Sequence, residues 1–471
     1  MLNPKGFNRQ WFVLICGDAC VAIGSAYGAA AALVWYGLGA PAPAAMPGIS
    51  AALAVIAVFV SYMSDLYKLD QPYVRSRIAR SVMSAQPLVG GIAAIVLFAE
   101  PSLVFGRRFF IGYMLISGPA MLTWRLAAAQ LFVSRIRIGV AILGIGEGVA
   151  MIAKEVLHRV DLGYAFLGFV EFEPKVGGRS NGRAGPARTA SEQPGHPGML
   201  RVKTLARLDE LSGLRILAIG DPRLAQTSSR DLIRLRLGGV EVLTVETLYE
   251  RMTGRLPVGM LSESRLALEQ GFCQSRTGAV VKRTIDLMFS VCLGLIVAPL
   301  AAAVAVAVKL DSPGPVLYSQ ERVGRDGRLF RVLKFRSMRR DAERVTGAVW
   351  ASDHDPRITR VGHWLRKWRI DELPQLINIM RGEMTAVGPR PERPEIVARL
   401  AEQIPFYEYR HLVRPGLTGW AQVCYPYGAT VTDAEQKLCY DLYYMKNWSL
   451  GFDIQIMFQT LKVVLFGRGA R

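Results

Sequence analysis

Two adjacent carboxylates open a predicted helix in the stretch RIDELPQLIN, residues 369–378, and GPRPE follows at residues 388–392. A carboxylate can act as a covalent nucleophile toward phosphorus, and a neighbouring acid can hold a hard divalent cation. Arginine clamps phosphate oxygens because its planar guanidinium makes two parallel hydrogen bonds. The simpler interpretation is an exposed Asp-Glu pair at a helix start, where acids are favoured without any function. The rest of the chain decides between the two.

The bulk composition predicts a membrane protein of two or three units. The chain has 471 residues, too many for one ordinary domain, and 51% of them are apolar. The net charge of +19 predicts an anionic partner, which can be lipid headgroups, phosphorylated substrates or nucleic acid. The six cysteines form no C-x-x-C pair, so neither a zinc site nor a disulfide framework is supported. This pattern fits a reduced, cytoplasmic setting for the soluble part.

Four apolar stretches near the N-terminus each approach the roughly 20 residues that span a bilayer. They are 11–38, 48–66, 81–99 and 108–133. Basic residues precede the first stretch, lie between the second and third, and follow the fourth. By the positive-inside rule, these ends are cytoplasmic. We therefore expect a four-helix transmembrane bundle over residues 1–135, with both ends inside.

A short apolar strand and a glycine turn follow at residues 138–150, and further strand-like runs lie at 164–172 and 214–220. This alternation predicts a small parallel α/β unit. The glycines are similar to a dinucleotide fingerprint, but Val149 stands where the third glycine or alanine belongs. We interpret residues 136–255 as a Rossmann-like module of the nucleotide- or CoA-binding type with a structural or regulatory role; a working NAD site is the alternative. A loop is expected within it at 174–198, and a linker at 256–280.

A fifth apolar segment, at about 285–308, has basic residues on both sides. A full crossing would carry the arginine-rich remainder outside, against the charge rule. Pro299 lies within the segment, and proline removes a backbone hydrogen bond and bends a helix. We predict a re-entrant membrane helix that enters the inner leaflet, breaks at Pro299 and returns. A fifth span and a buried helix are the alternatives.

Basic residues are dense after this segment. Lys334 and Arg336 alternate with apolar side chains, as on a strand with one charged face. One interpretation is a solvated basic face near anionic lipid. The other is a phosphate-binding wall opposite Asp371 and Glu372, which would suit a nucleotide-sugar diphosphate with a metal ion.

These motifs together resemble the bacterial sugar transferase family, the monotopic phosphoglycosyl transferases. In chain order they are KRTID at 282–286, DSPGPV at 311–316, QERVG at 320–324, KFRSM at 334–338, DELPQ at 371–375, GPRP at 388–391, PGLTGWAQV at 415–423 and NWS at 447–449. The four spans and the Rossmann-like module make the whole chain similar to the large members, which are polyprenyl-phosphate hexose-1-phosphate transferases of exopolysaccharide or O-antigen assembly. The resemblance implies a monotopic catalytic domain over residues 281–471.

The resemblance also implies a two-step reaction. Asp371 would attack the β-phosphorus of a UDP-hexose and expel UMP, leaving an aspartyl phosphosugar. Undecaprenyl phosphate would then accept the phosphosugar. A covalent carboxyl phosphate lets one site serve a water-soluble donor and a lipid acceptor in turn.

The implied site residues are few. Glu372 would hold Mg²⁺, Arg390 would clamp phosphate, and Asp441 is a weaker candidate. The helpers at the phosphate would be Arg322, Lys334 and Arg336. The implied setting is the cytoplasmic face of the bacterial inner membrane, with membrane lipid and a second copy of the chain as partners and no nucleic acid. Two residues depart from the family pattern: Ala298 replaces the usual serine before Pro299, and Glu383 replaces a common aspartate.

Two other classes of protein share some of these sequence features. Membrane-bound nucleotide-sugar dehydratases need a Tyr-x-x-x-Lys pair, and no tyrosine here has lysine four residues on. A catalytically silent scaffold or sensor of polysaccharide assembly predicts a broken acid pair or a missing arginine clamp, and both are intact. The donor hexose stays open between glucose and galactose, and N-acetylated sugars are not dismissed.

Overall fold

The computed structural model divides the chain into two compact units, Met1–Thr253 and Gly254–Arg471. The structure describes residues 9–38, 41–64, 66–67, 75–99, 107–135, 138–144, 149, 152–155, 164–172, 199–202, 213–220, 229–261, 263–268, 271–273, 275–339, 357–425, 428 and 430–466. Most of the glycine turn after the first predicted strand, and the expected loop at 174–198, lie outside these ranges.

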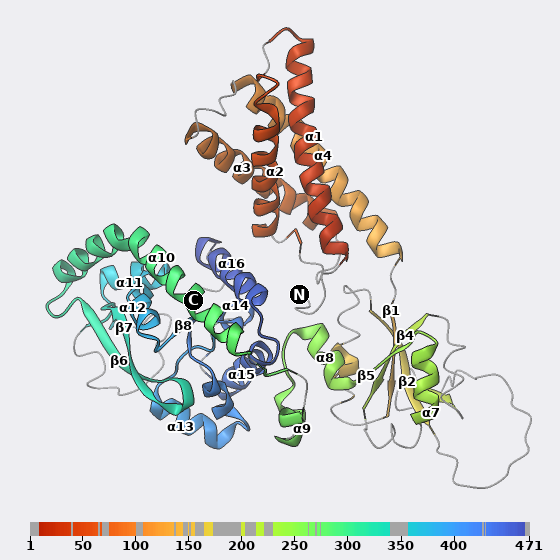
Figure 1. Ribbon diagram of the computed structural model, residues 1–471, viewed down its shortest axis with the longest axis vertical. Helices are drawn as coiled ribbons and strands as arrows, with labels where there is room; N and C mark the ends of the chain where they lie inside the picture. The colour runs from red at the N-terminus through yellow and green to blue at the C-terminus, as the bar shows by residue number, and fades with distance from the viewer. Residues whose placement is uncertain are drawn as a thin grey trace, which may run out of the picture. The chain divides into compact units, whose positions relative to one another are not determined.

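Long helices form the N-terminal part of the first unit (Figure 1). They are α1 (Arg9–Trp35), α2 (Met46–Met63), α3 (Arg75–Ala99) and α4 (Arg107–Arg135). Large side chains such as Ile49, Leu53 and Phe109 fill their shared core and are at most 1% exposed. The helices approach closely at Gly17, where any side chain would collide with the ring of Trp124.

Four helices in the described part of the chain are long and apolar enough to cross a membrane. They are Phe12–Trp35, Met46–Met63 and Ile78–Ile95 in the bundle, and Arg276–Asp311 in the second unit. Three of the four predicted N-terminal spans are thereby supported. The fourth, α4, has 29 residues, which is long enough to cross, but arginines including Arg125 lower its hydropathy. Its crossing stays a prediction.

A buried ion pair joins the first and last helices of the bundle. Asp18 and Arg125 are 0% and 4% exposed and form a salt bridge. Tyr67 Oη donates to Asp18 Oδ2 at 2.7 Å, and Trp124 Nε1 donates to Oδ1 at 3.1 Å. Arg125 also donates to the carbonyl of Leu66 at 2.7 Å. Charged groups in an apolar bundle are tolerated when they are paired, so this cluster holds the helices in one register.

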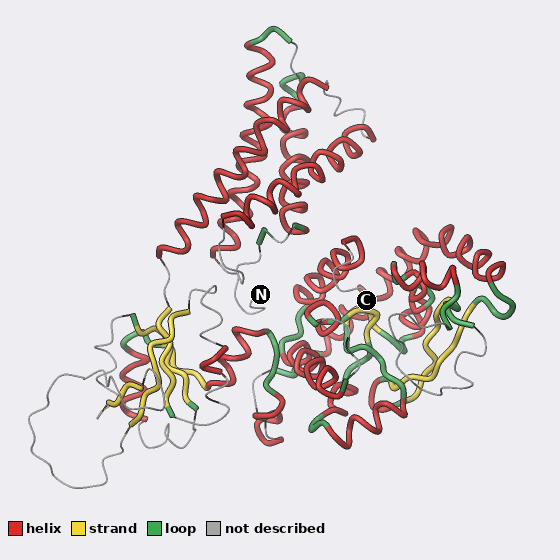
Figure 2. The backbone as a smooth tube through the Cα atoms, turned by 180° about the vertical axis from the view of Figure 1, so that it is seen from behind, coloured by secondary structure: helices red, strands yellow, loops and turns green. Residues whose placement is uncertain are grey.

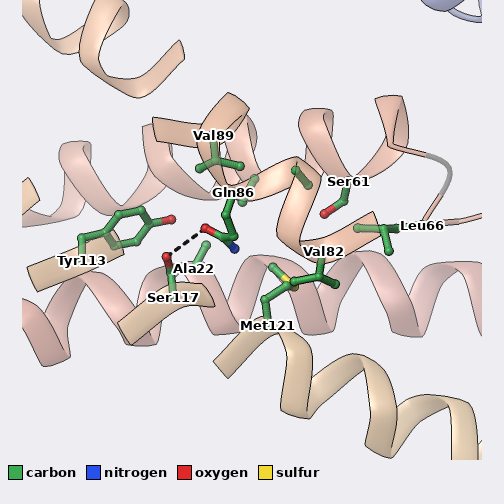
Figure 3. Close-up of a pocket in the computed structure, with 11 residues that line it drawn as sticks. Ala22, Ser61, Leu66, Val82, Gln86, Val89, Tyr113, Ser117 and Met121 are labelled. Atoms are coloured by element: carbon green, nitrogen blue, oxygen red, sulfur yellow. Dashed lines mark hydrogen bonds between the residues drawn. The ribbon is translucent and has the colours of Figure 1, made fainter. Parts of the chain in front are cut away.

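A small pocket inside the same bundle has a polar side (Figure 3). Ser117 Oγ donates to Gln86 Oε1 at 3.3 Å, and Ser61 and Tyr113 line the pocket with them. Alanines and larger apolar side chains complete the lining. Ser117 and Gln86 therefore satisfy one another across the helices, as apolar surroundings require.

A parallel sheet forms the rest of the first unit (Figure 2). Its strand order is β3-β2-β1-β4-β5. The strands are β1 (Ile138–Leu143), β2 (Tyr164–Phe172), β3 (Met199–Val202), β4 (Leu214–Ile219) and β5 (Glu241–Thr244), with helices α7 (Ser229–Leu237) and α8 (Val245–Thr253). Continuous apolar runs such as that of β1 are typical of strands covered on both faces. The predicted parallel α/β unit is confirmed, and its strand order is that of the first five strands of the doubly wound dinucleotide-binding folds. Gly144 ends β1 with φ of +98°, which favours glycine.

The second unit packs short helices and strands around an aromatic core. Its elements are α9 (Glu263–Leu268), α10 (Arg276–Asp311), β6 (Leu317–Val323), β7 (Leu329–Phe335), α11 (Arg360–Lys367), α12 (Gln375–Arg381), β8 (Thr385–Val387), α13 (Pro394–Gln403), β9 (Gly416–Thr418), α14 (Trp420–Cys424), α15 (Val431–Lys446) and α16 (Leu450–Phe466). In the core, Trp420 packs edge-on against Phe452 with ring centroids 5.0 Å apart. Leu256 and Val258, from the stretch expected as a linker, are buried in this core.

Helix α10 is one 36-residue helix with Pro299 inside it, and its ribbon bends along its length (Figure 1). At about 1.5 Å per residue it exceeds the roughly 30 Å hydrocarbon thickness of a bilayer. Its first half packs through Phe289 and Leu293 against α12, and its second half through Val304 and Val308 against Leu365 of α11. The predicted helix is therefore present, but the predicted break at Pro299 is wrong, because the chain stays helical through this residue.

The buried ion pair of the bundle gives a first prediction. Asp18→Ala leaves Arg125 buried without a counterion, a change that typically costs about 3–5 kcal/mol. We expect a clearly lower thermal midpoint of the full-length protein in detergent. Ser50→Ala is the matched control, because Ser50 is also buried but donates only to the Pro47 carbonyl of its own helix start. Equal shifts for the two variants would contradict the role given to Asp18.

Candidate functional site

The acid pair sits in a single 3-10 turn, η6 (Ile370–Glu372), between α11 and α12. Arg369 precedes it in the left-handed conformation, with φ of +54°. This conformation ends α11 abruptly and costs a non-glycine residue about 1 kcal/mol. The turn that follows places Asp371 and Glu372 at 8% and 7% exposure. The simpler interpretation, an exposed acidic helix start, is therefore wrong.

Glu372 is held by three cationic side chains. Lys334 Nζ lies 3.0 Å and Arg390 Nη2 lies 2.7 Å from Glu372 Oε1. Arg369 Nη1 lies 3.8 Å from Oε2. Burial alone would raise the pKa of Glu372, but Arg390 and Lys334 outweigh it and hold this pKa well below its usual value. Glu372 is therefore ionised and ties together three separate segments.

Asp371 has the opposite environment. Burial raises the pKa of its carboxyl, Lys334 opposes the rise, and the charge of Glu372 adds to it. Within the described ranges, no hydrogen bond reaches the Asp371 side chain. One acid of the pair is thus fixed by partners, while the other keeps its oxygens available and is more basic than an ordinary aspartate.

Lys334 reaches the acids because β7 is fastened to α12. Asn378, fully buried, accepts from the backbone N–H of Leu333 at 3.0 Å and donates to the carbonyl of Arg331 at 2.8 Å. Its amide also donates to Glu383 Oε2 at 2.7 Å. The longer side chain of Glu383 is thus accommodated. Sequence reasoning assigned Asn378 no role, although a lone amide in the apolar run LINIM was a signal.

Arg390 lies at the rim of the site, with its side chain still 34% exposed. Arg410, which is 6% exposed, donates to the Arg390 carbonyl at 3.0 Å and lies 2.8 Å from Asp441 Oδ2. That last contact is an ion pair without aligned hydrogen-bond geometry. Asp441 therefore supports Arg390 indirectly, through its ion pair with Arg410. Arg410 was not singled out in the sequence.

Two predicted phosphate-binding residues are placed elsewhere. Arg322 donates to Glu392 at 3.3 Å and to Gln320 at 2.7 Å, and has no contact with the acid pair. Arg336 is 5% exposed and donates to the carbonyls of Ser312 and Val308 at 2.6 and 3.1 Å.

Arg336 thus caps the end of α10, where helix carbonyls lack partners. Gly314 has φ of +133°, and a Cβ there would lie 2.1 Å from the Arg336 guanidinium, so this turn requires glycine. The alternation of Lys334 and Arg336 correctly indicated a strand. For Arg336, the structure corrects the expected contact with phosphate. Its guanidinium caps α10 and does not face Asp371 and Glu372.

The carboxylates of the site can bind a divalent cation in one way. The described residues contain no cluster of three or more His, Cys, Asp or Glu side chains. Magnesium typically needs only one or two carboxylates, together with water and substrate phosphates. Asp371 and Glu372 supply that number, provided that the ion displaces a cationic side chain from Glu372. The residues present therefore fit Mg²⁺ bound together with a phosphorylated substrate.

The buried Asp441 gives a prediction about pH. Burial raises its pKa to about 6, so the folded protein holds this proton more tightly than the unfolded chain does. The stability from this group is full below the ordinary pKa and is lost as the pH rises through about 6. We expect the thermal midpoint of the wild type, relative to Asp441→Asn, to fall mainly between about pH 4.5 and 6.5 and to change little above that range.

Asp433 is the control for this measurement. It is exposed, and its pKa is lowered by hydrogen bonds from Thr430. Its contribution is lost only on acidification, so Asp433→Asn should differ from the wild type by a constant amount over the same range. A wild-type advantage over Asp441→Asn that grows with rising pH would contradict the burial argument.

Comparison with known proteins identifies the second unit. Residues 277–467 match the family model described as bacterial sugar transferase. The chain is 44% identical over 251 residues to a UDP-N-acetylgalactosamine-undecaprenyl-phosphate N-acetylgalactosaminephosphotransferase of Aeromonas hydrophila, covering 53% of this chain and 58% of that protein. It is 42% identical over 255 residues to an undecaprenyl-phosphate glucose phosphotransferase of Komagataeibacter xylinus, covering 53% of this chain and 48% of that one. Both matches thus span about half of the relatives' own lengths.

A third relative is matched over almost its whole length. The exopolysaccharide production protein PSS of Rhizobium leguminosarum bv. phaseoli is 43% identical over 187 residues, which are 39% of this chain and 94% of that protein. The region that the family model matches, residues 277–467, contains Asp371, Glu372 and the cations around them. The chain therefore belongs to the bacterial sugar transferase family.

Proposed function

We propose that this protein transfers a sugar 1-phosphate from a UDP-sugar to undecaprenyl phosphate and releases UMP. The observation that carries the proposal is the buried acid pair, in which Glu372 is held by cations while Asp371 has no such partner among the described residues. Family membership adds the substrate classes, since the names of two relatives specify undecaprenyl-phosphate phosphotransferases.

In the first step, an oxygen of Asp371 attacks the β-phosphorus of the UDP-sugar. The bond from that phosphorus to the oxygen bridging the two phosphates breaks, and its electron pair leaves with UMP. In the second step, a phosphate oxygen of undecaprenyl phosphate attacks the same phosphorus. The aspartyl oxygen–phosphorus bond then breaks and restores the carboxylate.

Charge decides whether a carboxylate can approach a diphosphate. Lys334, Arg369 and Arg390 bring three positive charges to a pair of acids that carries at most two negative ones. The surplus offsets repulsion as the nucleophile approaches. The exposed rim position of Arg390 suits a contact with the incoming phosphates.

Glu372 would hold Mg²⁺ together with the donor phosphates, and the bound ion would neutralise charge on the diphosphate. Arg390 and Lys334 could then turn from Glu372 to phosphate oxygens. Arg410 and Asp441 would keep the backbone at Arg390 in place during that exchange.

The membrane position follows from α10. Both halves of this helix pack on the same unit, which supports a helix whose two ends stay on one side of the bilayer. Its middle presents apolar side chains, with Leu295 and Ile296 71% and 75% exposed. A re-entrant helix accounts for both features, and the charge rule puts the site on the cytoplasmic face of the inner membrane. The homodimer and the ligand of the sheet module stay predictions.

The donor panel should cover the sugars that the relatives' names include. UDP-glucose, UDP-galactose and UDP-N-acetylgalactosamine would each be offered to the full-length protein in nanodiscs with Mg²⁺ and undecaprenyl phosphate. We expect UMP release with one donor. Asp371→Asn should lower the rate at least about 10³-fold, because the nucleophile is lost.

Asp326→Asn serves as the matched control, since Asp326 is an exposed acid of the same unit, 56% exposed. Its rate should equal that of the wild type. Folded wild-type protein that releases no UMP from any donor would overturn the transferase proposal and favour a membrane scaffold of polysaccharide assembly.

The raised pKa of Asp371 predicts how the rate of UMP release falls at acidic pH. The nucleophile must be ionised, and burial raises its pKa above that of an ordinary aspartate. The rate constant kcat/KM should therefore decline on acidification at a higher pH than an ordinary aspartate would give. A pH profile of UMP release measures this limb. A flat profile down to about pH 4 would contradict it.

A further inference from the structure

A carboxylate of α10 is bonded to the strand that leads into Arg390. Asp286 is 4% exposed, and its two oxygens have different partners on β8. Oδ2 accepts from the hydroxyl of Thr385 at 2.6 Å, and Oδ1 accepts from the backbone N–H of Ala386 at 3.0 Å. A single side chain thus fixes two consecutive residues of this strand.

Strand β8 has only three residues and one strand neighbour, β9, in the described part of the unit. Side chains replace the missing neighbour on its other edge. The Val387 carbonyl accepts from Lys282 Nζ at 3.2 Å and from Tyr444 Oη at 2.9 Å. Such a short strand gains little from its own ladder, so its position depends on these side chains. Two of them, Lys282 and Asp286, belong to α10.

The strand continues directly into the site. Gly388 donates to the Thr418 carbonyl at 2.8 Å, and the Pro389 carbonyl accepts from Gly416 at 2.8 Å. Arg390, the next residue, reaches Glu372 at 2.7 Å. Arg390 lies four positions after Ala386, and the two residues directly before it are hydrogen-bonded to β9.

Helix α10 also carries the apolar surface of the unit. Met288 and Leu295, within three turns of Asp286, are 62% and 71% exposed. The helix that would lie in lipid is thus the helix that holds the strand before Arg390.

We infer that Asp286 is a positioning residue for Arg390, acting through β8. This inference rests on the proposed transfer reaction and extends it to the membrane helix. Loss of the carboxylate would leave the buried N–H of Ala386 without a partner and release the strand edge. Arg390 would then be displaced from the phosphates by more than good alignment tolerates. A misplacement of about 1 Å can cost 10²-fold in rate.

The test is a double-mutant cycle on UMP release by the full-length protein in nanodiscs. We expect Asp286→Ala to lower kcat about 100-fold with a smaller change in KM. Arg390→Lys keeps the charge but loses the fork of the guanidinium, and so supplies the second background. In the Arg390→Lys background, Asp286→Ala should lower kcat less than about threefold, because the alignment of the guanidinium no longer contributes. An equal loss in both backgrounds would overturn the inference, since a general structural role is additive.

Ser290→Ala is the matched control on the same helix face. Ser290 is fully buried and donates to the carbonyls of Asp286 and Leu287 at 2.7 and 3.1 Å, and among the described residues its side chain makes no hydrogen bond to β8. Its kcat should stay at the wild-type value. If Asp286→Ala does not fold, Thr385→Val removes only the hydroxyl bond to Asp286. It should lower kcat less than Asp286→Ala is expected to, and its effect should again be smaller in the Arg390→Lys background.

Hydrogen exchange supplies a readout that is independent of activity. Asp286→Ala should raise the exchange of the peptide that contains Ala386, and Ser290→Ala should not. If the wild type releases no UMP from any donor, the proposed function fails, and the exchange result alone then decides the anchoring of β8. Unchanged exchange in Asp286→Ala would overturn the inference whatever the activity.

Discussion

The second unit depends on the carboxylate of Glu372, because three segments meet at it. Lys334 comes from β7, Arg390 from the loop after β8, and Arg369 from the turn that ends α11. A buried carboxylate is costly unless it is paired, and pairing with several cations makes the arrangement stable. The same pairing gathers positive charge beside Asp371. Stability of the site and its suitability for a diphosphate therefore have one physical origin.

Helix α10 links this site to a long apolar surface. Its early turns hold β8 through Lys282 and Asp286, and its end is capped by Arg336. The polar contacts lie on the side that faces the unit, while exposed apolar residues such as Leu295 lie between them along the chain. A helix with this distribution can enter a lipid layer and still serve as a structural element of the active site. A lipid acceptor would then approach along the helix that aligns the arginine.

The first unit follows different rules. In its bundle, Asp18 and Arg125 are buried together and share partners, so polar contacts fix the register where apolar packing alone would not distinguish one rotation from another. In its sheet, buried apolar strands such as β1 form a parallel order of the dinucleotide-binding type. The family model matches residues 277–467, so the bundle and the sheet both lie outside the region that defines the family.

The sequence by itself determined the elements whose signal is local. Apolar runs of span length, strands with turn residues between them, and the motif around Asp371 and Glu372 depend on neighbours within a few residues. Only the tertiary structure separated Arg390 from Arg336, since both are arginines in basic stretches but their partners lie 18 and 24 residues away. Asn378, Arg410 and Asp286 likewise owe their roles to contacts across 47, 20 and 100 residues. Such distances leave no periodic trace in a single chain, because the pairing arises when separate elements pack together.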